Sequence, residues 1–174
     1  RISARARISG ELAAMTIVAD TGPLIALAKV DQLVLLQVLF GDVAVPLTVM
    51  QESLAKQSPE SRRIRQALVT YIGSIPLSTM PPNIKLVTQG LDLGEAEAVA
   101  LAAVQSVPLL IDDAAGRKAA LKVGIQVIGT VGVLLHAKQI GHIKQVSPIL
   151  TELRNQGYWL SDALLRQARL LTNE

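Results

Sequence analysis

Residues 109–138 read LLIDDAAGRKAALKVGIQVIGTVGVLLHAK. Apolar runs of strand length at 109–111 and 125–128 alternate with helical patterns at 114–123 and 130–140. This alternation is typical of units in which parallel strands are connected by helices. Asp112 and Asp113 follow the first run directly, and Thr130 comes just after the second. The stretch therefore predicts an α/β fold with polar side chains at the carboxyl ends of parallel strands, where ligands bind in such sheets.

The same alternation continues on both sides of this stretch. We expect strands at 16–19 and 43–45, and an edge strand and a loop around the apolar pieces 75–77 and 84–87. We expect helices at 24–30, 31–40 (capped by Asp31), 46–54, from Ser58 onward, at 94–106, 147–156 and 161–171. A mostly parallel sheet covered by helices on both faces follows from this pattern.

Length and composition predict one domain. The chain has 174 residues, half of them hydrophobic, which excludes intrinsic disorder. We expect a single domain over 15–174, with a helical extension from about residue 145. Met15 directly precedes the first apolar run, so residues 1–14 are interpreted as a tail, either an expression remnant or an overcalled upstream extension. No apolar run reaches the roughly 18 residues of a membrane span, and we expect a soluble, cytoplasmic protein.

Composition also limits the chemistry. The chain has no cysteine and two histidines, so a metal ion would be held mainly by carboxylates, which favours Mg²⁺ or Mn²⁺. Four aromatic side chains argue against a nucleic-acid site built on stacked bases. Most of the net charge of +3 comes from residues 1–14, which carry Arg1, Arg5, Arg7 and Glu11. Global charge therefore gives little information about binding partners.

Several acids fall where such a site is expected. Asp20 ends the first predicted strand, and Asp112 and Asp113 end the strand at 109–111. Two predicted helices add Glu52 and Glu95. Carboxylates packed together raise one another's pKa values, and a divalent cation relieves this repulsion. Two such cations about 3.5–4 Å apart can promote the cleavage of a phosphodiester.

Simpler roles compete with this interpretation. The aspartates, including Asp92, could cap helices, and the glutamates could be solvated surface residues. However, only one of Asp112 and Asp113 can cap the helix that follows. Glu97 competes with Glu95, although the two lie on different helix faces. Side chains that could assist the site, or serve only as a cap or solvated surface, are Thr21, Arg117, Lys118 and Thr130.

Five stretches in order resemble the PIN-domain nucleases, especially their prokaryotic, toxin-like branch. They are IVADTGPLIALAKV (17–30), VPLTVMQESL (45–54), LDLGEAEAVALA (91–102), residues 109–138 and GYWLSDALL (157–165). The resemblance implies a three-layer α/β/α sandwich with a parallel sheet of four or five strands. It also implies an endoribonuclease dependent on Mg²⁺ or Mn²⁺, which hydrolyses RNA phosphodiesters with a metal-bound water.

The resemblance assigns roles by position. Asp20 would be the first metal ligand, and Glu52 and Glu95 would match acids on two helices. Asp112 would match the aspartate of a late strand, with Asp113 beside it as a ligand or water-positioning residue. Thr130 matches a polar residue near the final strand. Many relatives are toxins that form homodimers and are silenced by a small antitoxin, so both partners are expectations here.

Two other hypotheses remain. A catalytically weak or inactive protein-interaction module with a PIN-like fold would bind a partner or itself without needing a divalent ion. A phosphoryl-accepting receiver domain also gathers Asp, Thr and Lys at strand ends. It fits poorly, because its acidic pair should follow the first strand, whereas the pair here comes late.

Overall fold

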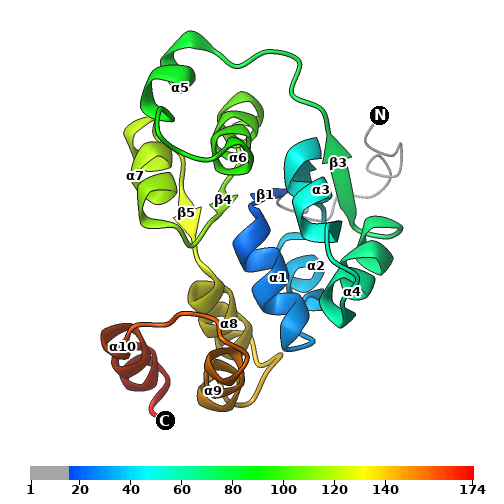
Figure 1. Ribbon diagram of the computed structural model, residues 1–174. Helices are drawn as coiled ribbons and strands as arrows, with labels where there is room; N and C mark the ends of the chain where they lie inside the picture. Colours follow the sequence, from blue (N-terminus) through cyan, green and yellow to red (C-terminus); the bar gives the residue numbers. More distant parts are fainter. Residues whose placement is uncertain (1–15) are drawn as a thin grey trace, which may run out of the picture.

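A central parallel sheet organises the computed structural model, which describes residues 16–174 (Figure 1). Its five strands lie in the order β3-β2-β1-β4-β5, and every neighbouring pair is parallel. Their bounds are β1 Ile17–Ala19, β2 Val43–Pro46, β3 Ile72–Ile75, β4 Leu109–Leu110 and β5 Val127–Ile128. The strand β1 lies in the middle, between β2 and β4, and chain connections reverse direction across the sheet there. Ligand sites of open α/β sheets form at such a position.

Within the described residues, ten helices accompany this sheet. They are α1 Thr21–Lys29, α2 Val34–Phe40, α3 Leu47–Leu54, α4 Pro59–Leu68, α5 Pro82–Val87, α6 Leu93–Gln105, α7 Ala114–Lys122, α8 Thr130–Gln139, α9 Ser147–Asn155 and α10 Asp162–Thr172. Figure 1 shows α8, α9 and α10 gathered at one end of the molecule, together with the C-terminus. The predicted α/β sandwich is therefore confirmed.

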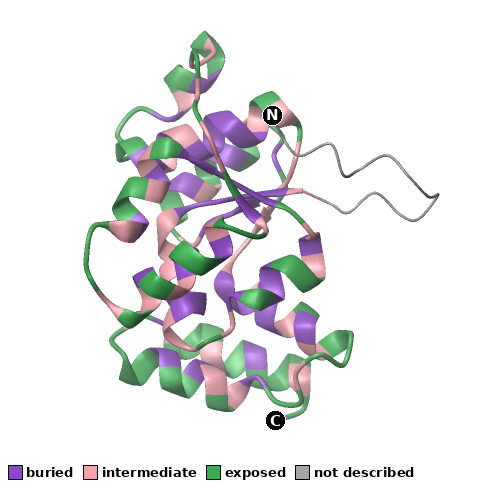
Figure 2. Ribbon diagram, turned by 90° about the vertical axis from the view of Figure 1, so that its right-hand side faces the viewer, coloured by how far each residue is buried: buried purple, intermediate pink, exposed green. Residues whose placement is uncertain are grey.

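The sheet is apolar on both faces at β1, β2, β4 and β5, because these strands carry only apolar residues, whereas the edge strand β3 contains Ser74. Ile17, Val45 and Leu110 face one core, which is completed by α1, α2, α4 and α8 to α10. Val18 and Leu109 face a second core, which is built mainly on the alanine-rich helix α6. Figure 2 shows the strands as a buried layer between partly exposed helices. These two cores make the three layers of the sandwich.

Two local expectations are wrong. The expected edge strand is present as β3, although it lies at 72–75, but the second apolar piece forms the helix α5 where a loop was expected. Pro82 begins this helix, a position where proline's fixed φ is already helical. Asp31 does not cap α2: it adopts a positive φ of 57° in the turn after α1, and its carboxylate pairs with Arg63 at 3.0 Å. Leu33 occupies the cap position instead.

Within residues 16–174, no single helix has both the length and the apolar composition needed to cross a membrane. The helices α1 and α2 meet those criteria only when they are taken together, and they are bent by 117° relative to each other. The predicted tail at 1–14 lies outside the described residues.

Candidate functional site

The predicted strand-end acids meet at the carboxyl edge of the sheet. The strands β1 and β4 are neighbours, and their register pairs Ala19 with Leu110. Asp20 therefore lies beside the segment that carries Asp112 and Asp113. The strand β5 adds Thr130 at the same edge, where it begins α8. Parallel pairing alone brings these residues together from positions far apart in the sequence.

Asp20 is the most deeply buried acid of this edge. Its side chain makes no capping hydrogen bond to α1, and the residue is only 6% exposed. Burial raises the pKa of Asp20 to about 6, and the negative charges of Asp92 and Glu52 add to the rise. The nearby backbone N–H groups of Thr21 and Gly22 partly oppose it. Asp20 is therefore a carboxyl group held where its charge is poorly stabilised, which is uncommon for a purely structural aspartate.

Glu95 faces the same group of acids from the start of α6. Burial raises the pKa of Glu95 to about 7, and the charges of Asp92, Asp113 and Asp20 contribute to the rise. Asp92 also caps α6, because its Oδ1 accepts the backbone N–H of Glu95 at 2.8 Å. Glu97 lies about 200° further round the helix and so points away from these acids. Glu95 is therefore the better candidate of the two glutamates.

Glu52 reaches the site from α3, across a contact with Thr21. The hydroxyl of Thr21 donates to Oε2 of Glu52 at 2.6 Å. A Cβ at Gly94 would stand 2.7 Å from that same oxygen, so a larger residue at this point of α6 would displace the carboxylate. Thr21 thus orients an acid of the site.

Asp112 is held by hydrogen bonds from two other parts of the chain. Its Oδ1 accepts the backbone N–H of Thr130 at 2.8 Å, and its Oδ2 accepts the hydroxyl of Thr130 at 2.5 Å. The hydroxyl of Tyr158 also donates to Oδ2. Gly129 allows this approach, because a Cβ there would lie 2.6 Å from Oδ1. Asp112 is therefore tied to the start of α8 and to the segment between α9 and α10.

Asp113 has a different environment from its neighbour. Its Oδ1 accepts the backbone N–H of Gly116 at 2.8 Å and so caps α7. The residue is exposed, and its charge acts on Glu95. The two neighbours therefore differ: Asp113 caps a helix and its charge acts on Glu95, whereas Asp112 is enclosed by hydrogen-bond donors.

The two basic candidates, Arg117 and Lys118, also have different environments. Arg117 donates from its guanidinium to the backbone carbonyl of Ile111 at 2.9 Å, so it supports the end of β4. Lys118 is exposed on the next position of α7. Of the two, Lys118 has the more accessible charge for a phosphate.

Sequence reasoning missed Tyr158. It comes from the GYWL segment at 157–160, and burial, followed by the charge of Asp112, raises the pKa of its hydroxyl. The hydroxyl therefore stays protonated and can donate. The available signal was a tyrosine between two predicted helices in a chain with few aromatic residues. The hydroxyl of a buried tyrosine usually has a hydrogen-bond partner, so such a residue points to a polar contact.

A divalent cation fits the chemistry of this edge. The acids supply hard oxygen donors, and the raised pKa values of Asp20 and Glu95 reflect burial and repulsion that a cation would relieve. Among residues 16–174, no three Asp, Glu or His side chains form a group that could hold an ion in the positions they occupy here. The oxygen donors therefore suit a divalent cation, but among the described residues they are not arranged as a preformed metal site.

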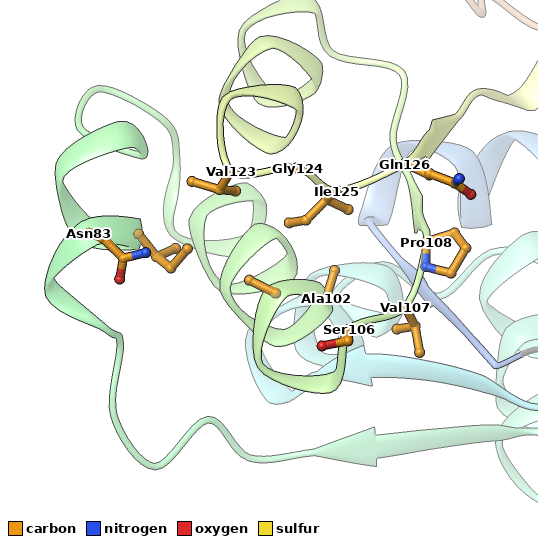
Figure 3. A pocket seen from close by; sticks show the side chains of 11 residues that line it. Asn83, Ala102, Ser106, Val107, Pro108, Val123, Gly124, Ile125 and Gln126 are labelled. Carbon is orange, nitrogen blue, oxygen red and sulfur yellow. The ribbon is translucent and has the colours of Figure 1, made fainter.

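A cavity of about 540 Å³ lies elsewhere, beside α5 and α6 (Figure 3). Its lining includes Pro108 and Gln126, which precede β4 and β5 and so mark the amino edge of the sheet. Its lining contains no acid and no histidine, and its side-chain polar groups come from Asn83, Ser106 and Gln126. The acidic edge on the opposite side is therefore the better candidate site.

Comparison with known protein families agrees with this geometry. A family model described as a PIN domain matches residues 16–174, which is nearly the whole chain and includes every acid of the site. No curated protein matches the chain significantly. The length of the family match and the parallel sheet with its acidic carboxyl edge lead to one conclusion: the chain belongs to the PIN-domain family.

Proposed function

We propose that this protein is an endoribonuclease that hydrolyses RNA phosphodiesters with the help of Mg²⁺ or Mn²⁺. PIN domains are generally nucleases, and they typically use divalent metal ions. One observation carries the proposal within this chain: Asp20 and Glu95 are acids whose charges are destabilised by burial and by neighbouring acids at the ligand-binding edge of the sheet.

In this proposal, the residues of the site have different roles. Asp20, Glu95 and Asp113 would hold the cation, and Asp112 would add its Oδ1, which has one lone pair left after accepting the N–H of Thr130. Glu52, oriented by Thr21, would accept a proton or orient the attacking water. Lys118 would contact an RNA phosphate. The chemistry that a bound cation supplies is activation of water and neutralisation of the charge on the phosphate.

The finer biological role is part of the same proposal. We infer that the protein acts as the toxin of a toxin–antitoxin pair, that it forms a homodimer, and that a small antitoxin protein covers the acidic edge. The exposure of Asp113 at this edge of the sheet supports access by a macromolecule.

The deciding experiment is cleavage of a panel of single-stranded and structured RNAs with Mn²⁺, with Mg²⁺ and with EDTA. Asp20→Asn keeps the size of the side chain and removes the charge. We expect at least a 100-fold loss of cleavage, which is the usual scale for removing a group that stabilises the transition state. Asp42→Asn is the matched control, because Asp42 is an exposed acid next to the amino end of β2.

The outcomes separate the hypotheses. Metal-dependent cleavage that is lost in Asp20→Asn and kept in Asp42→Asn supports the nuclease. Equal cleavage in all three proteins indicates a contaminating ribonuclease and contradicts the role of Asp20. A protein that neither cleaves RNA nor binds Mn²⁺ in calorimetry is the interaction module instead.

A further inference from the structure

The segment between α9 and α10 reaches the acidic edge through Tyr158, and the proposed function gives this residue no role. We propose that Tyr158 is a positioning residue of the site, which fixes the carboxylate of Asp112 jointly with Thr130. The inference rests on the proposed function, because it assigns a part of the same site. It makes the helical extension a component of that site and not an appendage.

The hydrogen bonds leave Asp112 little freedom. A carboxylate oxygen offers about two lone-pair directions. Oδ2 accepts from the hydroxyls of Thr130 and Tyr158, which uses both, and Oδ1 accepts from the backbone N–H of Thr130. Only one direction, at Oδ1, stays open. Removal of the Tyr158 hydroxyl would free one side of Oδ2 and allow the carboxylate to rotate about its Cβ–Cγ bond.

The backbone around Tyr158 is itself held in place. Its N–H donates to the carbonyl of Leu153 at 3.0 Å, and the preceding Gly157 turns the chain with a φ of +78°. Leu160, two residues later, is 7% exposed and belongs to the core that contains β1. The hydroxyl is therefore delivered by an ordered segment, and little entropy is lost when it binds Asp112.

The ring of Tyr158 has a separate structural role, because it packs partly buried against the same core. Tyr158→Phe keeps this packing and removes only the hydrogen bond. Tyr71 provides the matched control: it is also partly buried against that core, but it directly precedes β3, at the opposite edge of the sheet from the acids. Tyr71→Phe therefore removes a hydroxyl far from the site.

The experiment measures Mn²⁺ affinity by calorimetry and RNA cleavage as separate kcat and KM values, well below the melting temperature of each variant. We expect Tyr158→Phe to lose about 10- to 100-fold in Mn²⁺ affinity or in kcat, the usual scale for a group that orients a metal ligand. The KM for RNA should stay unchanged, and Tyr71→Phe should match the wild type. Thr130→Val should change the same quantities, which keeps the test decisive if Tyr158→Phe folds poorly.

A double-mutant cycle distinguishes positioning from a general structural effect. Because the hydroxyl acts through Asp112, adding Tyr158→Phe to Asp112→Asn should cause little further loss. Additive losses would overturn the inference, as would wild-type affinity and kcat in a folded Tyr158→Phe protein.

The wild-type result shows which proposal fails. If the wild type binds Mn²⁺ but cleaves no RNA, the ribonuclease function is overturned, and the Mn²⁺ affinity of Tyr158→Phe still decides the positioning role. A wild type that neither binds Mn²⁺ nor cleaves overturns both.

Discussion

Asp20 and Glu95 hold protons more tightly in the folded protein than in an unfolded chain. Their pKa values are raised to about 6 and about 7, from ordinary values of 3.8 and 4.5. The stability that they contribute is therefore fully present below the ordinary values and is lost as the pH rises through the raised ones. The site is thus built at the expense of stability at neutral pH, which is common for functional residues.

This gives a pH prediction for the metal-free protein. In EDTA, the free energy of unfolding should fall as the pH rises from about 4 to 7, because Asp20 and Glu95 still hold protons in the folded protein that the unfolded chain has already released. Urea unfolding at a series of pH values measures this slope. A flat profile across that range would contradict the raised pKa values.

The same reasoning predicts a trade-off for one substitution. At pH 7 in EDTA, Asp20→Asn should be more stable than the wild type, by up to about 3 kcal/mol, which corresponds to the rise of its pKa to about 6. Mn²⁺ should stabilise the wild type more than Asp20→Asn, because the ion binds only the folded site. Lower stability of Asp20→Asn in EDTA would instead indicate a structural role for the charge.

At the scale of elements, the site depends on the close approach of α3 and α6. Gly94 lies in the first turn of α6, and the Glu52 carboxylate occupies the space that a Cβ would take. Because Gly94 has no side chain, it leaves room for the carboxylate of Glu52 on the neighbouring helix α3. The need for glycine at this position comes from tertiary packing, so the local sequence signals of a helix do not reveal it.

Gly94→Ala should separate stability from activity. The added Cβ meets the end of a flexible side chain, so Glu52 can swing away at low cost, and alanine favours a helix by up to about 1 kcal/mol. We expect unchanged or slightly higher thermal stability together with at least a 10-fold loss of cleavage. Gly73→Ala is the control, because a Cβ there meets nothing within 4 Å. A large fall in melting temperature for Gly94→Ala would contradict this account.

At the scale of the whole molecule, Glu174 ties α10 to the rest of the fold. Its carboxylate accepts the backbone N–H groups of Val146 and Ser147 at the start of α9, and it pairs with Lys138 of α8. Burial alone would raise the pKa of Glu174, but these hydrogen bonds lower it to about 2. One side chain thus joins three helices, including the two that present Tyr158 to Asp112.

Glu174→Gln should therefore lower the melting temperature near pH 7 by about 2–4 °C, the shift that a loss of roughly 1 kcal/mol causes in a chain of this size. The difference from the wild type should shrink as the pH falls from about 4.5 to 2, because the wild-type carboxylate then takes up a proton. Asp162→Asn is the comparison, because its pair with Arg154 has side chains 67% and 53% exposed and should contribute little. Equal shifts in the two variants would contradict the role of Glu174.

Much of the architecture could be predicted from the sequence, because it depends on local signals. Apolar runs without alternating polar residues specify buried parallel strands, and helical periodicity specifies the covering layers. Asp92 and Ser58 were readable as helix starts, and both do cap their helices. The helix at 82–87 could not be predicted in this way. A short apolar piece after two prolines has no periodicity that distinguishes a helix from a strand or a loop.

The sequence by itself determined that acids would gather at the carboxyl edge of a parallel sheet, since strand direction and chain order place every strand end there. Only the tertiary structure showed which acids influence one another: the charges of Asp92, Asp113 and Asp20 act on Glu95, whereas Asp112 is enclosed by the hydroxyls of Thr130 and Tyr158. It also brought in Tyr158, which is 46 positions from its partner along the chain. The physical reason is that contacts between side chains from distant elements depend on helix rotation and packing distance, which local propensity and periodicity do not specify.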